Sequence, residues 1–284
     1  MSVKILADSA CDLPLSFYEE NGVTLFPLKV QLNDTEYEDL VTIEPKDVYD
    51  AIREGQVPKT SQVSPLHFEE TFMKMAEQNE DGIYVSFSSG LSGTYQTAVM
   101  ILEQVKEKYP DFKLSIIDSK AASLGYGLIV KAAAAKAQSG ASKEDIQQDI
   151  ELRCRHLESL FTVNDLEYLA KGGRVSKASA FLGGLLNIKP LLTVEDGKLV
   201  PIEKLRGKKK LLRRIIELMK ENGTSFENQT VGISHADDED TALEMQKLIL
   251  EELKAKEVYI TSIGSAIGSH TGPGTIAIFY QKQI

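Results

Sequence analysis

Short apolar runs alternate with longer stretches of helical periodicity along most of the chain. In the first half, apolar runs over residues 3–9, 81–88 and 113–119 each lead into a loop rich in Ser, Asp or Gly. Stretches at about 94–109 and 122–139 have the spacing of amphipathic helices and would connect these runs. The pattern therefore predicts an N-terminal α/β domain with a Rossmann-like parallel sheet.

One segment departs from this pattern. Residues 25–39 alternate with period two on both sides of Asn33-Asp34, a pair typical of tight turns. We therefore expect a small β-hairpin inserted near the N-terminal sheet.

The second half begins a new series of strands after a long helical region that ends near Leu157. The apolar or alternating runs cover residues 157–163, 189–194, 199–206, 230–236, 257–264 and 275–281. Asp196-Gly197 joins two of these runs and predicts an antiparallel hairpin. We expect two domains, residues 1–155 and 156–284, the second with a mixed α/β sheet.

Composition and charge exclude several classes of protein. The 284 residues carry a formal net charge of −10, whereas nucleic-acid-binding proteins present broad basic faces. The N-terminal apolar run is too short for a signal peptide, and no run approaches the roughly 20 apolar residues of a membrane span. We expect a soluble, cytoplasmic protein that does not bind nucleic acid.

Metal and disulfide chemistry have no support in the sequence. Cys11 and Cys154 lie far apart without a CxxC spacing. The histidines other than His270 show no ligand spacing among themselves. We therefore expect no metal and no cofactor.

The hydroxyl-rich stretch FSSGLSGTYQTA, residues 87–98, lies where a strand gives way to a helix. It misses the nucleophile elbow G-x-S-x-G because Thr94 stands at the last glycine position, and the chain contains no P-loop. A strand, a tight turn and a helix N-terminus beside Ser92 and Thr94 would suit an anion. The alternative is that Ser92 only caps the helix.

Two further segments have the composition of binding loops. Residues 59–70 place Thr60 and Ser61 just before a helix start at Ser64-Pro65, although an ordinary polar turn remains an alternative. Residues 264–275 place His270 among hydroxyls and four glycines, which allow close approach of backbone to a ligand. A binding loop is favoured there over a structural histidine.

Cationic residues form two more candidate features. Gly172-Gly173-Arg174 can present a guanidinium to a carboxylate or phosphate. The apolar residues that follow it would line a cavity or belong to the core: Phe181, Leu182, Leu185 and Leu186. The basic run 206–214 opens an amphipathic helix that is either a solvated face or a contact for an anionic membrane surface or an acidic partner.

Five motifs in this order resemble the DegV family, the bacterial fatty-acid-binding proteins. They are ADSACDLP, KTSQVSP, SSGLSGTYQTA, GGRVSK and GSHTGPGT, and together they span nearly the whole chain. Val63 departs from the pattern, because the family commonly has proline there. The resemblance implies a two-domain α/β protein that encloses one long-chain fatty acid. It also implies that the protein is the lipid-presenting subunit of a fatty acid kinase, whose separate ATP-binding subunit forms an acyl phosphate.

Matching positions assign roles under this resemblance. Thr60 and Ser92 would bind the carboxylate, with Ser61 nearby and His270 and Thr271 completing the network. Arg174 would serve the contact with the kinase or the phosphoryl step. Two alternatives stay open: a serine hydrolase or esterase using Ser92 with His270, and a lipid-binding regulatory protein without a kinase partner.

Overall fold

The computed structural model describes residues 3–175 and 188–282. The predicted apolar segment with Phe181, Leu182, Leu185 and Leu186 lies outside the described residues. Within the described ranges the chain forms a four-stranded sheet, a six-stranded sheet and a small three-stranded sheet.

The N-terminal sheet is entirely parallel, as the sequence predicts. Its order is β2 (Thr24–Phe26), β1 (Lys4–Asp8), β6 (Gly82–Ser86) and β7 (Leu114–Asp118). Strand β2 was not expected, because two of its three residues, Leu25 and Phe26, fall in the segment assigned to the hairpin. Three residues are too few to show a period of their own, and pairing with β1 decides their state.

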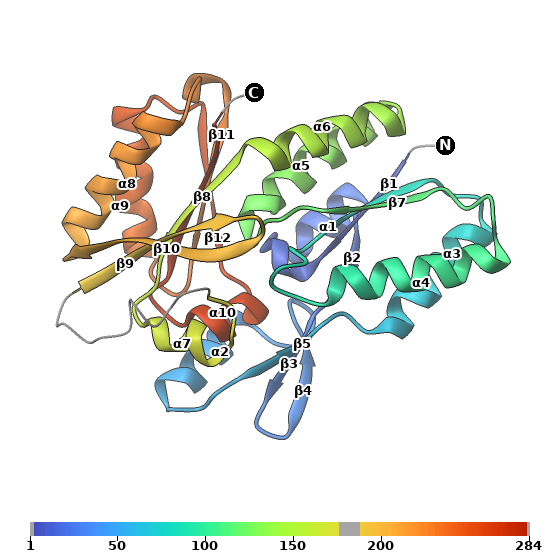
Figure 1. Cartoon of the computed structure of the whole chain (residues 1–284), viewed down its shortest axis with the longest axis horizontal. Helices are drawn as coiled ribbons and strands as arrows, with labels where there is room; N and C mark the ends of the chain where they lie inside the picture. The colour runs from blue at the N-terminus through green and yellow to red at the C-terminus, as the bar shows by residue number, and fades with distance from the viewer. Residues whose placement is uncertain (1–2, 176–187, 283–284) are drawn as a thin grey trace.

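Helices cover both faces of this sheet (Figure 1). On one side lie α1 (Leu15–Asn21), α5 (Leu124–Gln138) and α6 (Lys143–His156), and on the other α3 (Pro65–Glu77) and α4 (Thr94–Lys108). The predicted helices at about 94–109 and 122–139 are thus confirmed as α4 and α5.

The inserted hairpin is also confirmed. It joins β3 (Lys29–Leu32) to β4 (Thr35–Glu38), and Asn33 in its turn has φ 55°, a left-handed conformation that Asn tolerates. A third strand, β5 (Lys59–Ser61), pairs antiparallel with β3, and α2 (Pro45–Arg53) lies between β4 and β5 in sequence. This small sheet therefore fixes the backbone that carries Thr60.

The C-terminal sheet is mixed, which confirms the predicted second domain type. Its order is β10 (Lys198–Arg206), β9 (Ile188–Glu195), β8 (Leu157–Thr162), β13 (Ile276–Gln281), β11 (Thr230–His235) and β12 (Glu257–Ser262). Only β11 and β12 pair in parallel. Helices α8 (Lys208–Asn222) and α9 (Glu239–Glu252) cover its outer face (Figure 1).

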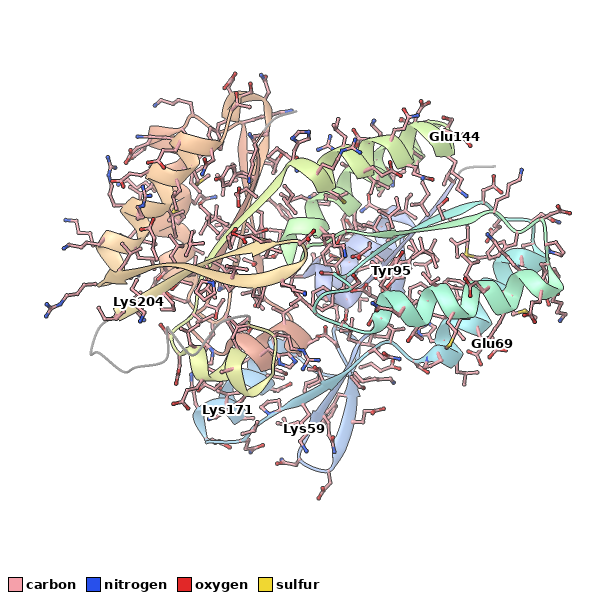
Figure 2. The ribbon with its side chains drawn as sticks, in the orientation of Figure 1. Lys59, Glu69, Tyr95, Glu144, Lys171 and Lys204 are labelled. Atoms are coloured by element: carbon pink, nitrogen blue, oxygen red, sulfur yellow. The ribbon has the colours of Figure 1, made fainter. Side chains whose placement is uncertain are left out.

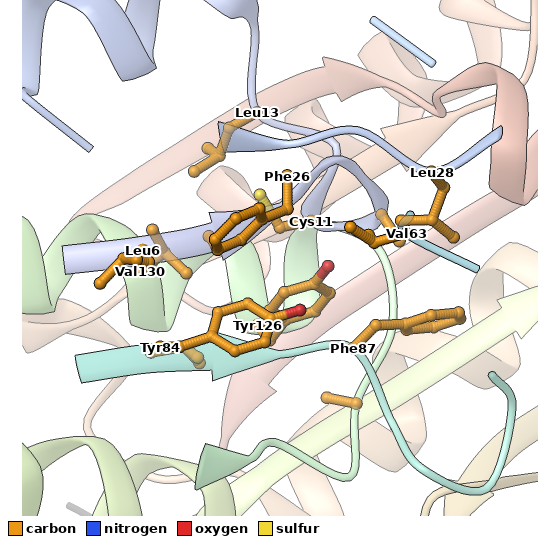
Figure 3. Close-up of a cluster of buried hydrophobic side chains, with 14 of the residues drawn as sticks. Leu6, Cys11, Leu13, Phe26, Leu28, Val63, Tyr84, Phe87, Tyr126 and Val130 are labelled. Carbon is orange, nitrogen blue, oxygen red and sulfur yellow. The ribbon is translucent and has the colours of Figure 1, made fainter. Parts of the chain in front are cut away.

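Both sheets contribute to one large apolar core. Ile83 of β6 and Phe279 of β13 belong to the same buried cluster. Aromatic rings from several elements fill its N-terminal part, including Phe26, Tyr84 and Tyr126 (Figure 3). The two sheets fall on either side of His156, where α6 ends and β8 begins. The domain boundary at 155/156 itself stays a prediction.

Two short helices lie between the halves: α7 (Leu166–Lys171) and α10 (Ser265–Thr271). Figure 1 shows α10 beside α7 and α2, at the junction of the three sheets. The expectation of a loop over residues 264–275 was therefore wrong for its first part. The glycine-rich composition of this segment favours a loop, because glycine has a low helix propensity. Packing against neighbours from both halves stabilises the helix instead.

Candidate functional site

A cavity of about 430 Å³ lies between the two halves of the molecule, and we call it the central cavity. Its volume is in the usual range for small-molecule sites. One wall comes from the mixed sheet and the other from the N-terminal half. The apolar lining consists of Leu28, Phe87, Leu91, Ala122, Phe161, Leu169, Val194, Leu199, Ile263, Ala266, Ile267, Ala277 and Phe279. Such a lining accepts an apolar ligand.

The polar residues singled out from the sequence line this same cavity. They are Thr60, Ser61, Ser92, Arg174, His270 and Thr271. Four separate segments of the chain supply them. The structure thus brings together every predicted site residue, whereas the roles assigned to them remain proposals.

Thr60 and His270 form the closest contact of this group. Thr60 Oγ1 lies 2.6 Å from His270 Nε2, and the contact joins β5 to the last turn of α10. Burial, with the positive charge of Arg174 as a smaller cause, lowers the pKa of His270 to about 4. The imidazole is therefore neutral near pH 7.

Gly172 determines where the His270 ring can lie. A Cβ atom at Gly172 would lie 2.3 Å from His270 Nδ1, so only glycine leaves room for the ring in this position. The predicted Gly-Gly-Arg turn thus has a second use besides presenting Arg174.

Ser92 lies in the turn that precedes α4, two residues before the helix begins at Thr94. Its Oγ accepts the N–H of Thr94 at 3.2 Å and lies 2.9 Å from Thr94 Oγ1. The N-cap position belongs to Gly93, so Ser92 closes a turn one residue earlier than a capping serine would. Val63 donates its N–H to Thr94 Oγ1 at 3.4 Å, a contact that proline at this position could not make.

Arg174 connects the two halves beside Ser92 and the Thr60–His270 pair, and we call this part of the cavity its polar end. Its Nε donates to the carbonyl of Leu91 at 3.3 Å, and its Nη1 donates to the carbonyl of Gly172 at 2.5 Å. A guanidinium has five N–H groups, so further donors remain for a ligand.

The other two predicted ligands differ in how available they are. Ser61 is solvent-exposed on β5, whereas Thr271 is buried and its hydroxyl donates to the carbonyl of Ile267 at 3.3 Å. Thr271 can therefore offer a ligand only an acceptor unless that bond breaks.

The geometry does not assemble a hydrolase triad. A serine nucleophile needs its hydroxyl on the base, but His270 Nε2 pairs with Thr60, and Ser92 Oγ pairs with Thr94. Among the described residues no carboxylate hydrogen-bonds to His270 to orient it. The hydrolase alternative therefore has no structural support.

Sequence reasoning missed the residues that hold α10. Asp12 accepts the N–H of Gly264 and Asp39 accepts the N–H of Ser265, each at 2.9 Å. Tyr49 donates to the carbonyl of Ile263 at 2.6 Å. Asp12 lies within the quoted motif ADSACDLP, but no sequence pattern indicated its distant partner.

These buried carboxylates have perturbed acidity. Burial raises the pKa of Asp39 to about 6 and raises that of Asp12 well above its ordinary value. The hydroxyl of Ser9 donates to Asp39 at 2.7 Å and partly offsets the loss of water. Ser123, whose hydroxyl donates to Asp12, has φ 55° and ψ −152°, a conformation that favours glycine.

Nearly the whole chain matches one known protein family. A family model described as "Uncharacterised protein, DegV family" matches residues 2–283. The chain belongs to the DegV family. The resemblance seen in the five motifs is thereby confirmed, and so is the two-domain α/β fold.

Relatives within the family are known as lipid binders. A protein of Thermotoga maritima named "Fatty acid-binding protein" is 34% identical over 282 residues, 97% of this chain and 96% of that protein. A solved structure described as fatty acid binding of a DegV family protein from Thermus thermophilus has TM-score 0.91 and 32% identity, covering 99% of this chain and 100% of that one. A stearic acid-binding protein from Eubacterium ventriosum has TM-score 0.88 and 28% identity, covering 99% and 98%.

No helix in residues 3–175 and 188–282 is long and apolar enough to cross a membrane. No group of three or more His, Cys, Asp or Glu side chains in the same ranges could hold a metal ion.

Proposed function

We propose that this DegV family protein binds one long-chain fatty acid in the central cavity and presents its carboxylate to a separate ATP-dependent kinase subunit. The observation that supports the proposal best is the lining of the central cavity, which is largely apolar and has a polar end formed by Thr60, Ser92, Arg174 and His270. Fatty-acid-binding relatives and structures with the same fold add to it.

The apolar lining accounts for affinity. Burying about 14 methylenes at roughly 0.8 kcal/mol each would contribute on the order of 11 kcal/mol before losses. A hydroxyl contact contributes only about 1 kcal/mol. The tail therefore supplies most of the binding free energy, and the polar end supplies position.

The polar end suits a carboxylate that has to react. Thr60, Ser92 and neutral His270 would contact it through hydrogen bonds without a full positive charge. Neutral donors withdraw less electron density from the carboxylate oxygens than a bidentate arginine would. The guanidinium of Arg174 donates hydrogen bonds to two carbonyls. We assign Arg174 to the phosphoryl step or to the contact with the kinase.

The basic run provides a second surface for a partner. In the structure α8 begins at Lys208, and Lys209 and Lys210 are exposed. We assign these lysines a weak, transient contact with an anionic membrane, from which a fatty acid would be taken.

Native mass spectrometry and a coupled assay test the proposal. Freshly purified protein should carry one fatty acid, and delipidated protein should bind one again on titration. ATP-dependent acyl phosphate should form only when a kinase subunit is added. Protein that never binds a fatty acid would contradict the carrier function, whereas binding without any acyl phosphate would favour a regulatory lipid-binding protein.

A further inference from the structure

A second, open depression of about 420 Å³ lies next to the polar end of the central cavity, and we call it the outer depression. It is lined by Gln62, Ser89, Gly90, Leu91, Ser92, Gly93, Gln96, Thr97 and Arg174. Five of these also line the central cavity: Gln62, Leu91, Ser92, Gly93 and Arg174. The two spaces therefore share one wall. Tyr95, labelled in Figure 2 at the start of α4, marks this part of the surface.

The chemistry of the outer depression is that of an anion site. Hydroxyls, side-chain amides and one guanidinium line it, and none of the described residues in its wall is acidic. In a chain with a formal net charge of −10, such a surface is unusual. Hydrogen-bond donors around a guanidinium are the groups that bind phosphate oxygens.

Contacts within the wall hold these donors in place. Gln62 Nε2 donates to Thr97 Oγ1 at 2.7 Å, which ties the end of β5 to the first turns of α4. Arg174 is held by two carbonyls from opposite halves of the molecule. These contacts preorganise the wall for a ligand.

One carboxylate lies close by, behind the wall. Asp118 accepts the N–H of Ser89 at 3.1 Å, and Lys120 Nζ lies 2.9 Å from Asp118 Oδ2. Lys120 Nζ also donates to Ser89 Oγ at 3.0 Å. The ion pair neutralises the carboxylate, so it opposes an anion in the outer depression only weakly.

We infer that the outer depression holds the phosphoryl group, first as the γ-phosphate of the nucleotide and then as the phosphate of the acyl phosphate. This inference rests on the proposed function. A carboxylate oxygen at the end of the central cavity forms a bond to the γ-phosphorus. The bond from that phosphorus to the β,γ-bridging oxygen breaks, and ADP leaves with the electron pair. Ser89, Gln96 and Thr97 are the new residues that the inference assigns to phosphate binding.

Alkyl phosphate binding tests this without a kinase. Delipidated full-length protein is titrated with hexadecanoate and with hexadecyl phosphate, which carries the same tail and a stable phosphate. Gln96 is exposed and lines only the outer depression, so Gln96→Glu should leave hexadecanoate affinity within about twofold and weaken hexadecyl phosphate about fivefold or more. Gln96→Lys should strengthen hexadecyl phosphate. Gln104→Glu, at an exposed position two turns further along α4, is the matched control and should change neither.

The outcomes separate the two proposals. Failure of the wild-type protein to bind hexadecanoate would contradict the proposed function. Wild-type protein that binds hexadecanoate but not hexadecyl phosphate would overturn the inference alone. Equal responses of both ligands to Gln96→Glu and Gln96→Lys would also overturn it, because the phosphate would then lie elsewhere.

Discussion

Thr60 and His270 meet through one short hydrogen bond, although 210 positions separate them along the chain. Ser92 reaches the same cavity from the turn that precedes α4, where its hydroxyl already accepts a backbone N–H. Single side chains at this end thus combine a structural contact with a ligand position. Substitutions at this scale should therefore separate fatty-acid affinity from acyl phosphate formation.

Ser92→Ala should weaken fatty-acid binding modestly and reduce kinase-coupled acyl phosphate formation much more. The loss of affinity is expected to be of order 1 to 2 kcal/mol, because one hydrogen bond and one local turn contact disappear. The reaction suffers more because a small displacement of the reacting group is costly. Titration calorimetry and a coupled assay with the kinase subunit measure the two effects.

Thr60→Val serves as the companion of Ser92→Ala. If both hydroxyls bind one carboxylate, the double variant should lose less than the sum of the single losses. Equal rates of kinase-coupled acyl phosphate formation for wild type and Ser92→Ala, with folding verified by circular dichroism, would show that Ser92 has only a structural role in its turn.

Gly172→Ala should disturb the site through His270. Gly172 has φ −74° and ψ −12°, which alanine adopts easily, so backbone strain is not the cause. The added methyl would instead lie 2.3 Å from His270 Nδ1 and displace the ring from Thr60. We expect about a tenfold loss of coupled activity with little change in thermal stability. The exposed neighbour Lys171→Ala is the control, and unchanged activity in Gly172→Ala would show that the ring position is unimportant.

At the scale of elements, α10 is the piece on which the polar end depends. Asp12 and Asp39 of the N-terminal half accept the first N–H groups at its start, and its last turn carries His270. The ring of Tyr49 packs directly against the same helix at Gly268, where an added Cβ would lie 2.7 Å from the ring. A short helix of the C-terminal half is thus fixed by side chains of the other half.

Asp39→Asn should raise stability at neutral pH and change how stability depends on pH. Burial raises the pKa of Asp39 to about 6, whereas its unfolded value is near 4, so the folded state binds the proton more tightly. The ionisation of Asp39 therefore lowers stability as pH rises from about 4 to about 6, by up to about 3 kcal/mol. Asparagine keeps an acceptor for Ser265 and removes this cost, whereas the Ser9 hydroxyl loses its acceptor, which offsets only about 1 kcal/mol of the gain.

Urea unfolding of delipidated protein at pH 4.5 and pH 8 measures the effect. The difference between Asp39→Asn and wild type should favour the variant more at pH 8 than at pH 4.5. A constant difference at both pH values would contradict the raised pKa.

Helix α8 shows how packing changes the meaning of a basic run. Arg213 Nη1 donates to Glu252 of α9 at 2.5 Å, and Arg214 Nε donates to Glu203 of β10 at 2.9 Å. Both acids lie on other elements, so the sequence run overstates the charge available to a partner. Lys209 and Lys210 have no ion pair among those found in the described residues.

Lys209→Glu combined with Lys210→Glu should weaken association with vesicles that contain anionic lipid. Each lysine near such a surface contributes about 1 kcal/mol, and added salt should reduce the wild-type association in the same direction. Vesicle sedimentation at low and physiological salt measures this. Lys256→Glu, which changes an exposed lysine outside α8, is the control. Unchanged vesicle binding in the double variant would show that the basic run is only a solvated face.

At the scale of the whole molecule, the central cavity has walls from both halves, so neither sheet forms the site alone. Phe161 and Phe279 come from the mixed sheet, and Leu28 and Phe87 come from the N-terminal half. Arg174 and the α10 contacts hold the halves together at the polar end. A ligand that touches both walls should therefore stabilise the molecule as one unit.

The sequence by itself determined the elements with a clear hydrophobic period. Apart from β2, the strands of the two large sheets follow from local patterns, as do the helices α4 and α5 and the hairpin at Asn33, because side-chain periodicity and turn chemistry act over a few residues. The motifs also supplied the predicted site residues, since a hydroxyl-rich turn is visible wherever it occurs.

Only the tertiary structure decided which of these residues meet. Strand β2 and helix α10 are too short to show a hydrophobic period of their own, and contacts with distant elements stabilise them. The pairing of Asp12 and Asp39 with α10, and the contact of Gly172 with His270, join positions far apart in the chain. Such contacts depend on how the two sheets pack. A local pattern of hydrophobic and polar residues does not specify which distant segments of the chain come into contact.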